Sequence, residues 1–233
     1  MTNRRLFELV TDDGCSISPY VWRTKYGLAL KRLDYQSCAV GFTDIPAIGS
    51  GAFSSVPVIQ DGEQWLGDSW AIAAYLDEAY SDRPKLFSCR AERAMVLFFE
   101  KWLASEVVSQ LFRICVFDIH NRLRAADRAY FRSTREARLG QPLEAAHAER
   151  ERYLPALRQR LQPMRLALRQ SHFLGGDAPN YADFIAAGAF IWAGSVATLK
   201  LLEADDPLLE WLGRCLDLYD AIGSSLSLPG LRL

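Results

Sequence analysis

The chain has 233 residues, of which 50% are apolar and 24% are charged, so it can bury the core of one large domain or of two small ones. Its formal net charge of −1 gives no reason to expect nucleic acid or an anionic membrane as a partner. Its five cysteines are widely spaced and form no CxxC pair, which argues against a disulfide framework or a zinc cluster. Because no apolar run is long enough for a secretory signal or a membrane span, we expect a cytoplasmic protein.

The first third of the chain alternates between strand and helix patterns. Short apolar runs predict strands at residues 5–10, 35–40, 56–60 and 63–67, and apolar residues at helical spacing predict helices at residues 19–33 and 68–80. Asp61-Gly62 is a hairpin signal between the last two strands. The Gly-, Ser- and Pro-rich segment 41–55 predicts a loop with room for one turn of helix at most. The sequence therefore predicts a small α/β domain over residues 1–80.

The character of the chain changes after a polar segment, residues 81–90, which we interpret as a linker. Residues 91–233 show no strand pattern and are predicted to be all-helical. Helices are predicted at residues 90–117, 141–170, 180–200 and 207–223. The first is apolar all round and is predicted to be a central buried helix, and the third is rich in small apolar residues and is predicted to pack in the core. Pro155 and Pro163 should end or kink the second.

The motif Ser18-Pro19-Tyr20 lies at the turn between the first predicted strand and helix. Proline is favoured at the first helical position, which makes Ser18 the N-cap. A helix N-terminus presents unpaired N–H groups and partial positive charge, and it can lower the pKa of a thiol placed there. Taken alone, the motif favours the simpler interpretation of Ser18 as a cap worth about 1 kcal/mol.

Val56-Pro57 opens the third predicted strand. A cis bond there would turn the N–H and C=O of Val56 outwards, where an extended peptide could pair with them as an added strand. Taken alone, an ordinary trans proline at the end of a loop is the expectation, because few X-Pro bonds are cis.

Asp68-Ser69 stands just before the last predicted helix of the first domain. Both residue types are common in the first turn, so helix capping explains them. The functional alternative is an acceptor beside helix-end donors, which together suit the ammonium and carboxylate of a small amino acid.

In their order and spacing, these three segments resemble the thioredoxin-like domain of a cytosolic glutathione transferase. "FLGGDAPNYADF" resembles the segment that begins the core helix of that family, with Asn180 and Asp183 as its N-capping box. "GCSISPYVWRTKYGL" and "VPVIQDGEQWLGDSWAIAAYLDE" are similar to bacterial glutathione-dependent β-aryl etherases and fungal fuscan-type glutathione transferases. The resemblance covers nearly the whole chain and implies a thioredoxin-like domain followed by an all-helical C-terminal domain.

The resemblance implies glutathione as cosubstrate and a homodimer, and the spacing of the histidines indicates no metal. Ser18 occupies the position where cysteine-type relatives place the reactive thiol, and it would donate a hydrogen bond to the glutathione sulfur. Cys15 lies three residues earlier in the turn, where the helix end would lower its pKa less. The backbone of Val56, beside Pro57, would pair with the cysteinyl unit of glutathione.

Asp68 and Ser69 would hold the γ-glutamyl end of glutathione. The partner of its glycine carboxylate stays unassigned, because Ser55 stands where relatives often have a basic residue. The histidines His120, His147 and His172 show no ligand spacing.

Large aromatic residues mark the helical part of the chain. Trp102, Phe112, Phe117 and Trp192 lie on apolar faces of predicted helices, which core packing explains, yet one or two could line a substrate pocket between the domains. The candidates for that pocket are Tyr20, Phe112 and Phe117.

The expected activity is a glutathione S-transferase acting on an apolar aromatic electrophile, and the etherase resemblance extends it to cleavage of β-aryl ethers of lignin-derived compounds. Two alternatives stay open. One is glutathione-dependent thiol–disulfide exchange through Cys15. The other is a non-catalytic module that binds glutathione and aromatic ligands or docks a partner protein.

Overall fold

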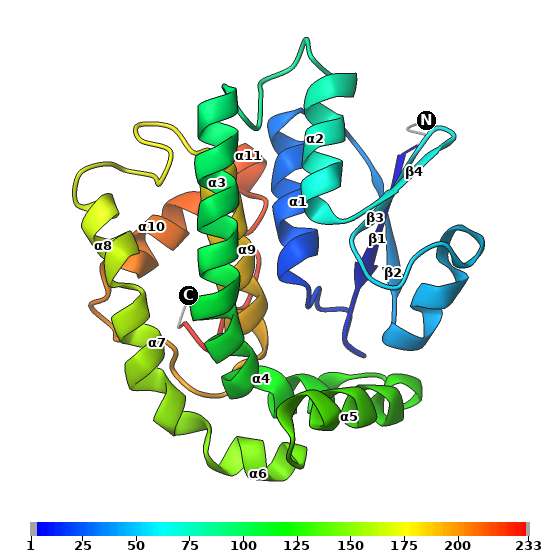
Figure 1. Ribbon diagram of the computed structural model, residues 1–233, viewed down its shortest axis with the longest axis vertical. Coiled ribbons are helices and arrows are strands. Elements are labelled where there is room, and N and C mark those ends of the chain that lie inside the picture. Colours follow the sequence, from blue (N-terminus) through cyan, green and yellow to red (C-terminus); the bar gives the residue numbers. More distant parts are fainter. Residues whose placement is uncertain (1–3, 232–233) are drawn as a thin grey trace.

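The computed structural model describes residues 4–231 and consists of a small sheet with its helices, packed against a larger helical part (Figure 1). The first part contains β1 (Arg4–Leu9), α1 (Pro19–Leu30), β2 (Gln36–Val40), η1 (Phe42–Gly51), β3 (Val58–Asp61), β4 (Gln64–Gly67) and α2 (Ser69–Ala79). The strand order is β2-β1-β3-β4, with β1 parallel to β2 and the other pairs antiparallel. This is the thioredoxin-like arrangement expected from the sequence.

The segment that follows β2 is more helical than predicted. It forms the 3₁₀ helix η1, which begins where the Gly41 N–H donates a hydrogen bond of 2.9 Å to the Asp44 carboxylate. The helix is interrupted at Ile48–Ser50, where Gly49 has a φ of +57°. The prediction of one turn of helix at most is therefore wrong, since a local carboxylate cap supports two short helical pieces in a segment that its Gly and Pro residues mark as a loop.

The elements after α2 are all helical in the part of the chain that the structure describes. They are α3 (Arg90–Trp102), the π-helical turn η2 (Leu103–Val108), α4 (Ser109–Arg122), α5 (Ala125–Leu139), α6 (Leu143–Ala148), η3 (Arg150–Tyr153), α7 (Leu154–Arg160), α8 (Gln162–Leu168), α9 (Tyr181–Val196), α10 (Pro207–Leu216) and α11 (Leu218–Ala221). Pro155 and Pro163 stand in the first turns of α7 and α8, so the predicted break of that segment is confirmed.

The core helix of this part is α9. Every residue of α9 is buried, as predicted for residues 180–200. Asn180 and Asp183 form the expected capping box at its start. The prediction of a buried helix from residue 90 is wrong for α3, which lies on the outside of α9 (Figure 1) and leaves Met95 and Phe98 65% and 68% exposed. Met95 and Phe98 thus lie on a face of α3 that no other part of residues 4–231 covers.

The sheet and the helical part meet along α1 and α9. Gly188 of α9 lies so close to α1 that a Cβ there would stand 2.5 Å from the Pro19 carbonyl oxygen. Nearby, the rings of Tyr26 and Phe184 stack with centroids 5.2 Å apart. This contact holds the first turn of α1, with Ser18 at its end, in a fixed place against the helical part.

Candidate active site

Ser18 caps the N-terminus of α1, as the sequence predicted. Its backbone is extended, Pro19 follows at the start of the helix, and its Oγ accepts a hydrogen bond of 3.3 Å from the Val21 N–H. The bond is long, and the side chain, although only 5% exposed, still lines a cavity. The hydroxyl proton is therefore free to be donated to an atom in that cavity, beside the positive end of α1.

Val56 reaches the same cavity from the segment before β3. The Val56-Pro57 peptide bond is cis, contrary to the trans bond that base rates alone favour. Neither the N–H nor the C=O of Val56 has a hydrogen-bond partner among residues 4–231. An extended peptide lying along this segment could satisfy both groups.

Asp68 and Ser69 begin α2. The Asp68 carboxylate accepts hydrogen bonds from the N–H groups of Trp70 and Ala71, at 3.0 and 2.9 Å, so the capping interpretation of Asp68 is confirmed. Asp68 has a φ of +66° and is exposed, while Ser69 is buried and its carbonyl accepts a hydrogen bond from the Tyr181 hydroxyl. A carboxylate on the surface next to a helix N-terminus offers the groups that an amino-acid terminus needs.

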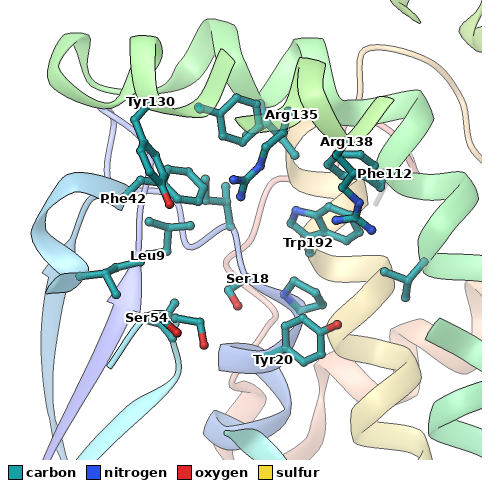
Figure 2. A pocket seen from close by; sticks show the side chains of 18 residues that line it. Leu9, Ser18, Tyr20, Phe42, Ser54, Phe112, Tyr130, Arg135, Arg138 and Trp192 are labelled. Atoms are coloured by element: carbon teal, nitrogen blue, oxygen red, sulfur yellow. The ribbon is translucent and has the colours of Figure 1, made fainter. Parts of the chain in front are cut away.

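The cavity beside Ser18 lies between the sheet, α1, α4, α5 and α9, and encloses about 300 Å³ (Figure 2). This is the lower end of the range for small-molecule sites. Of the residues singled out in the sequence it brings together Ser18, Tyr20, Val56, Phe112 and Trp192. Tyr20 is 39% exposed at the rim, where the Arg23 guanidinium lies 4.6 Å from the centre of its ring.

Phe117, a predicted pocket residue, does not line this cavity. It follows Phe112 by five positions on α4, which turns it about 140° around the helix axis. There its ring packs 4.6 Å from that of His147 and stacks on His120. Trp102 is also directed elsewhere and packs on Phe99.

Much of the cavity wall comes from elements that the sequence did not mark. Phe42 of η1 contributes to it, as do Tyr130, Phe131, Arg135 and Arg138 of α5. Helix α5 was not predicted, and Figure 2 shows its side chains descending over Ser18. The aromatic rings of Phe42 and Phe131 lie 5.2 Å apart, joining η1 to α5. The only sequence signal for this wall is the dense Arg and aromatic content of residues 124–138.

A buried carboxylate fastens α5 to η1. Asp127 is fully buried and accepts hydrogen bonds from the Thr43 N–H (2.8 Å), the Thr43 hydroxyl (2.9 Å) and the Arg124 guanidinium (2.9 Å). Burial alone would raise the pKa of Asp127, but Arg124 and Thr43 outweigh it and lower that pKa below its usual value. Arg124 also pairs with Asp44 at 2.7 Å. The wall formed by α5 is thereby held over the sheet.

Cys15 lies outside this cavity. It lines a separate hollow with Glu8 and Lys25, which form an ion pair of 2.6 Å. Burial would raise the pKa of the Glu8 carboxyl, but Lys25 outweighs it and lowers that pKa. The sequence offers two places for a reactive thiol, the side chain of Cys15 and a glutathione thiol bound at Ser18. The structure places them in separate hollows.

Within residues 4–231, no three His, Cys, Asp or Glu side chains are grouped in a way that could hold a metal ion. Over the same residues, no helix is both long and apolar enough to cross a membrane.

The fold and the site define a two-domain protein. Its thioredoxin-like part directs the N-terminus of α1 and the unpaired backbone groups of Val56 towards one cavity. Comparisons with known proteins agree. The glutathione S-transferase N-terminal domain matches residues 17–79, and the glutathione S-transferase C-terminal domain matches residues 94–215. The chain therefore belongs to the glutathione S-transferase family.

Individual relatives are similar over most of the chain. A glutathione S-transferase of Hyoscyamus muticus is 26% identical, over 85% of this chain and 89% of that protein. The glutathione transferase GSTFuA3 of Phanerochaete chrysosporium is 28% identical with a TM-score of 0.76, and the match covers 94% of this chain and 92% of that one. A Ceriporiopsis subvermispora glutathione S-transferase, solved in complex with glutathione, shares the fold at 24% identity and a TM-score of 0.77, over 93% and 96% of the two chains. The expected resemblance to fuscan-type transferases is confirmed.

Proposed function

We propose that this protein is a glutathione S-transferase that activates glutathione at Ser18 and adds it to an aromatic electrophile. The observation that carries the proposal is the cavity itself. It brings a helix-end hydroxyl and the unpaired N–H and C=O of Val56 to one side of a wall of aromatic rings. The family membership and the glutathione-bound relative support glutathione as the cosubstrate.

Glutathione would lie extended from Ser18 to α2. Its cysteinyl unit would pair with Val56, and its γ-glutamyl end would meet Asp68 and Ser69 at the start of α2. The thiol would then stand at the N-terminus of α1, where the Ser18 hydroxyl donates a hydrogen bond to the sulfur. Lowering the thiol pKa by about two units corresponds to about 2.7 kcal/mol, which a helix end and one charge-assisted hydrogen bond can supply together.

The electrophile would occupy the aromatic side of the cavity, between Phe112 and Trp192. The glutathione thiolate attacks its electrophilic carbon, a carbon–sulfur bond forms, and the leaving group departs with the bonding electron pair. With a β-aryl ether, attack falls on the β-carbon, the carbon–oxygen bond breaks, and a phenolate leaves that takes its proton from water. Holding both reactants in one cavity supplies the remaining rate enhancement.

Mass spectrometry of glutathione adducts tests this proposal. Wild type, Ser18→Ala and Cys15→Ser are each incubated with glutathione and a panel of aryl halides, enones and β-aryl ethers. We expect adducts with wild type and Cys15→Ser, and much slower formation with Ser18→Ala. Equal rates for wild type and Ser18→Ala would refute the role of Ser18. Disulfide reduction that only Cys15→Ser abolishes would favour thiol exchange, and retention on glutathione resin without any adduct would favour a binding module.

The proposal extends to the domains, the oligomeric state and the location of the protein. Residues 1–80 would form the glutathione-binding domain and residues 91–233 the helical domain, joined by a linker at residues 81–90. The exposed Met95 and Phe98 of α3 support a homodimer, since large apolar side chains grouped on a surface commonly mark an interface. The five free cysteines are in keeping with a cytoplasmic location.

A further inference from the structure

Two arginines of α5 line the cavity opposite the glutathione side. In Figure 2, Arg135 and Arg138 extend from α5 towards the interior, and Ser18 lies between them and Ser54. Arg135 is half-buried and Arg138 is exposed. Both positive charges stand among the aromatic rings of the cavity, Arg135 at Phe42 and Phe131 and Arg138 at Phe112.

Neither arginine has an acidic partner. Within residues 4–231, no carboxylate lies within 4.0 Å of Arg135 or Arg138, although Arg124 and Arg132 of the same helix are both paired. The guanidinium of Arg135 donates a hydrogen bond of 2.8 Å to the Thr134 hydroxyl and also has the Tyr130 hydroxyl beside it. Burial lowers the pKa of Arg135, Tyr130 opposes this effect and the nearby Arg138 adds to it. Within the described chain, no carboxylate thus compensates the positive charge of this wall.

Aromatic rings fix the orientation of both side chains. The Arg135 guanidinium lies over the rings of Phe42 and Phe131, at 4.9 and 4.7 Å, and that of Arg138 lies over Phe112 at 4.5 Å. Contacts of this kind restrict the motion of a guanidinium, so little rotational freedom is lost when it binds an anion. The planar pair of donors on each arginine matches the two oxygens of a carboxylate.

We infer that Arg135 and Arg138 form an anion-binding subsite for the second substrate, which makes aromatic electrophiles bearing a carboxylate the preferred class. This inference rests on the proposed function, because it assigns the substrate of the same cavity. The aromatic ring of such a substrate packs among Phe112 and Trp192 while its carboxylate meets the arginines. Its electrophilic carbon is then directed towards the thiolate at Ser18.

A matched pair of substrates isolates the charge. A chlorodinitrobenzoate and its methyl ester undergo the same substitution, in which glutathione sulfur bonds to the carbon that carries chlorine and chloride leaves. They differ in one negative charge. For wild type we expect a lower KM for the benzoate than for the ester. Arg135→Met and Arg138→Met should each raise the KM for the benzoate about 10- to 100-fold, the loss of one charge-assisted hydrogen bond, while the KM for the ester rises far less.

The control is Arg113→Met on α4. Arg113 also lies over an aromatic ring, that of Tyr153 at 5.6 Å, and has no carboxylate partner in the described chain, but it does not line the cavity. Its replacement removes the same charge and the same stacking contact. We expect the KM values for both substrates to stay as in wild type. Arg135→Lys and Arg138→Lys, which keep the charge, should recover part of the preference for the benzoate.

Three results would overturn the inference. Equal changes for benzoate and ester would show that the arginines only pack, and a raised KM for glutathione instead would assign them to its glycine carboxylate. The third would be an unchanged affinity of the arginine variants for the unreactive dinitrobenzoate, with binding measured by tryptophan fluorescence. This binding assay needs no turnover. If wild type conjugates neither these two substrates nor any member of the electrophile panel, the proposed function fails, while the fluorescence titration still decides whether the subsite exists.

Discussion

Replacing Asp127 with alanine tests how the α5 wall of the cavity is held in place. The carboxylate of Asp127 is fully buried and accepts three hydrogen bonds, two from Thr43 of η1 and one from Arg124. Removing it leaves the Thr43 N–H without its carboxylate acceptor and Arg124 without one of its two carboxylate partners. Thr43 is exposed and the Arg124 side chain is 33% exposed, so water offsets part of both losses. Losing hydrogen bonds to a buried charge costs about 1–3 kcal/mol, and we expect Asp127→Ala to lower the free energy of unfolding by about that amount.

The same change should affect one substrate more than the other. Because Asp127 holds α5 over the sheet, its loss loosens the wall that carries Tyr130 and Arg135, while Val56 and α2 stay in place. The KM for the aromatic electrophile should therefore rise more than the KM for glutathione.

Urea unfolding followed by circular dichroism measures the stability change, and initial conjugation rates measure the two KM values. Asp82→Ala is the control, since Asp82 is exposed and its contact with Arg83 is 3.5 Å long. Its stability should stay within about 0.5 kcal/mol of wild type. If Asp127→Ala matched wild type as closely, the buried network would not fasten α5.

Three further predictions concern acid, packing and assembly. The pKa values of Asp127 and Asp44 are lowered by their partners. The stability that these two carboxylates contribute is therefore present above the unfolded pKa of 3.8 and is lost as pH falls below it. In urea unfolding from pH 6 down to about pH 3, the difference in free energy of unfolding between wild type and Asp127→Asn should become smaller, and a constant difference would contradict the assignment. Gly188→Ala places a methyl group against the Pro19 carbonyl, so it should lower the free energy of unfolding by about 1–2 kcal/mol and reduce activity. Gly213→Ala, at a helical position with open space around it, should instead raise the free energy of unfolding by up to about 1 kcal/mol. Thermal melting of both variants checks this. Phe98→Glu should shift the protein from dimer to monomer in sedimentation, and an unchanged mass would exclude this face of α3 from the dimer.

The sequence predicted those parts of the fold that rest on local signals. The N-cap Ser18 with Pro19, and the capping box of Asn180 and Asp183, each mark a helix start that the structure reproduces. Alternating strands and the Gly62 turn likewise identify the β3–β4 hairpin. These signals act within a few residues, so they can be recognised without knowledge of the tertiary contacts.

The wall of the cavity could not be predicted in this way. Helix α5 buries only Asp127 and Phe131, so its sequence carries no continuous apolar stripe. Its position depends on the contact between Asp127 and Thr43, which lie 84 residues apart. The exclusion of Phe117 from the cavity likewise depends on which face of α4 is directed at the cavity, and the spacing of Phe112 and Phe117 alone does not give that face. Long-range contacts of this kind leave little trace in a single sequence.

The pKa of glutathione bound to the protein tests the central claim most directly. Ultraviolet absorbance of the thiolate, recorded across a pH titration of the binary complex, gives this value without a second substrate. For wild type we expect a pKa about two units below that of the free thiol, and for Ser18→Ala a pKa about one to two units higher than wild type, since one charge-assisted hydrogen bond to sulfur is lost. Identical titration curves for wild type and Ser18→Ala, both at the value of free glutathione, would contradict the account.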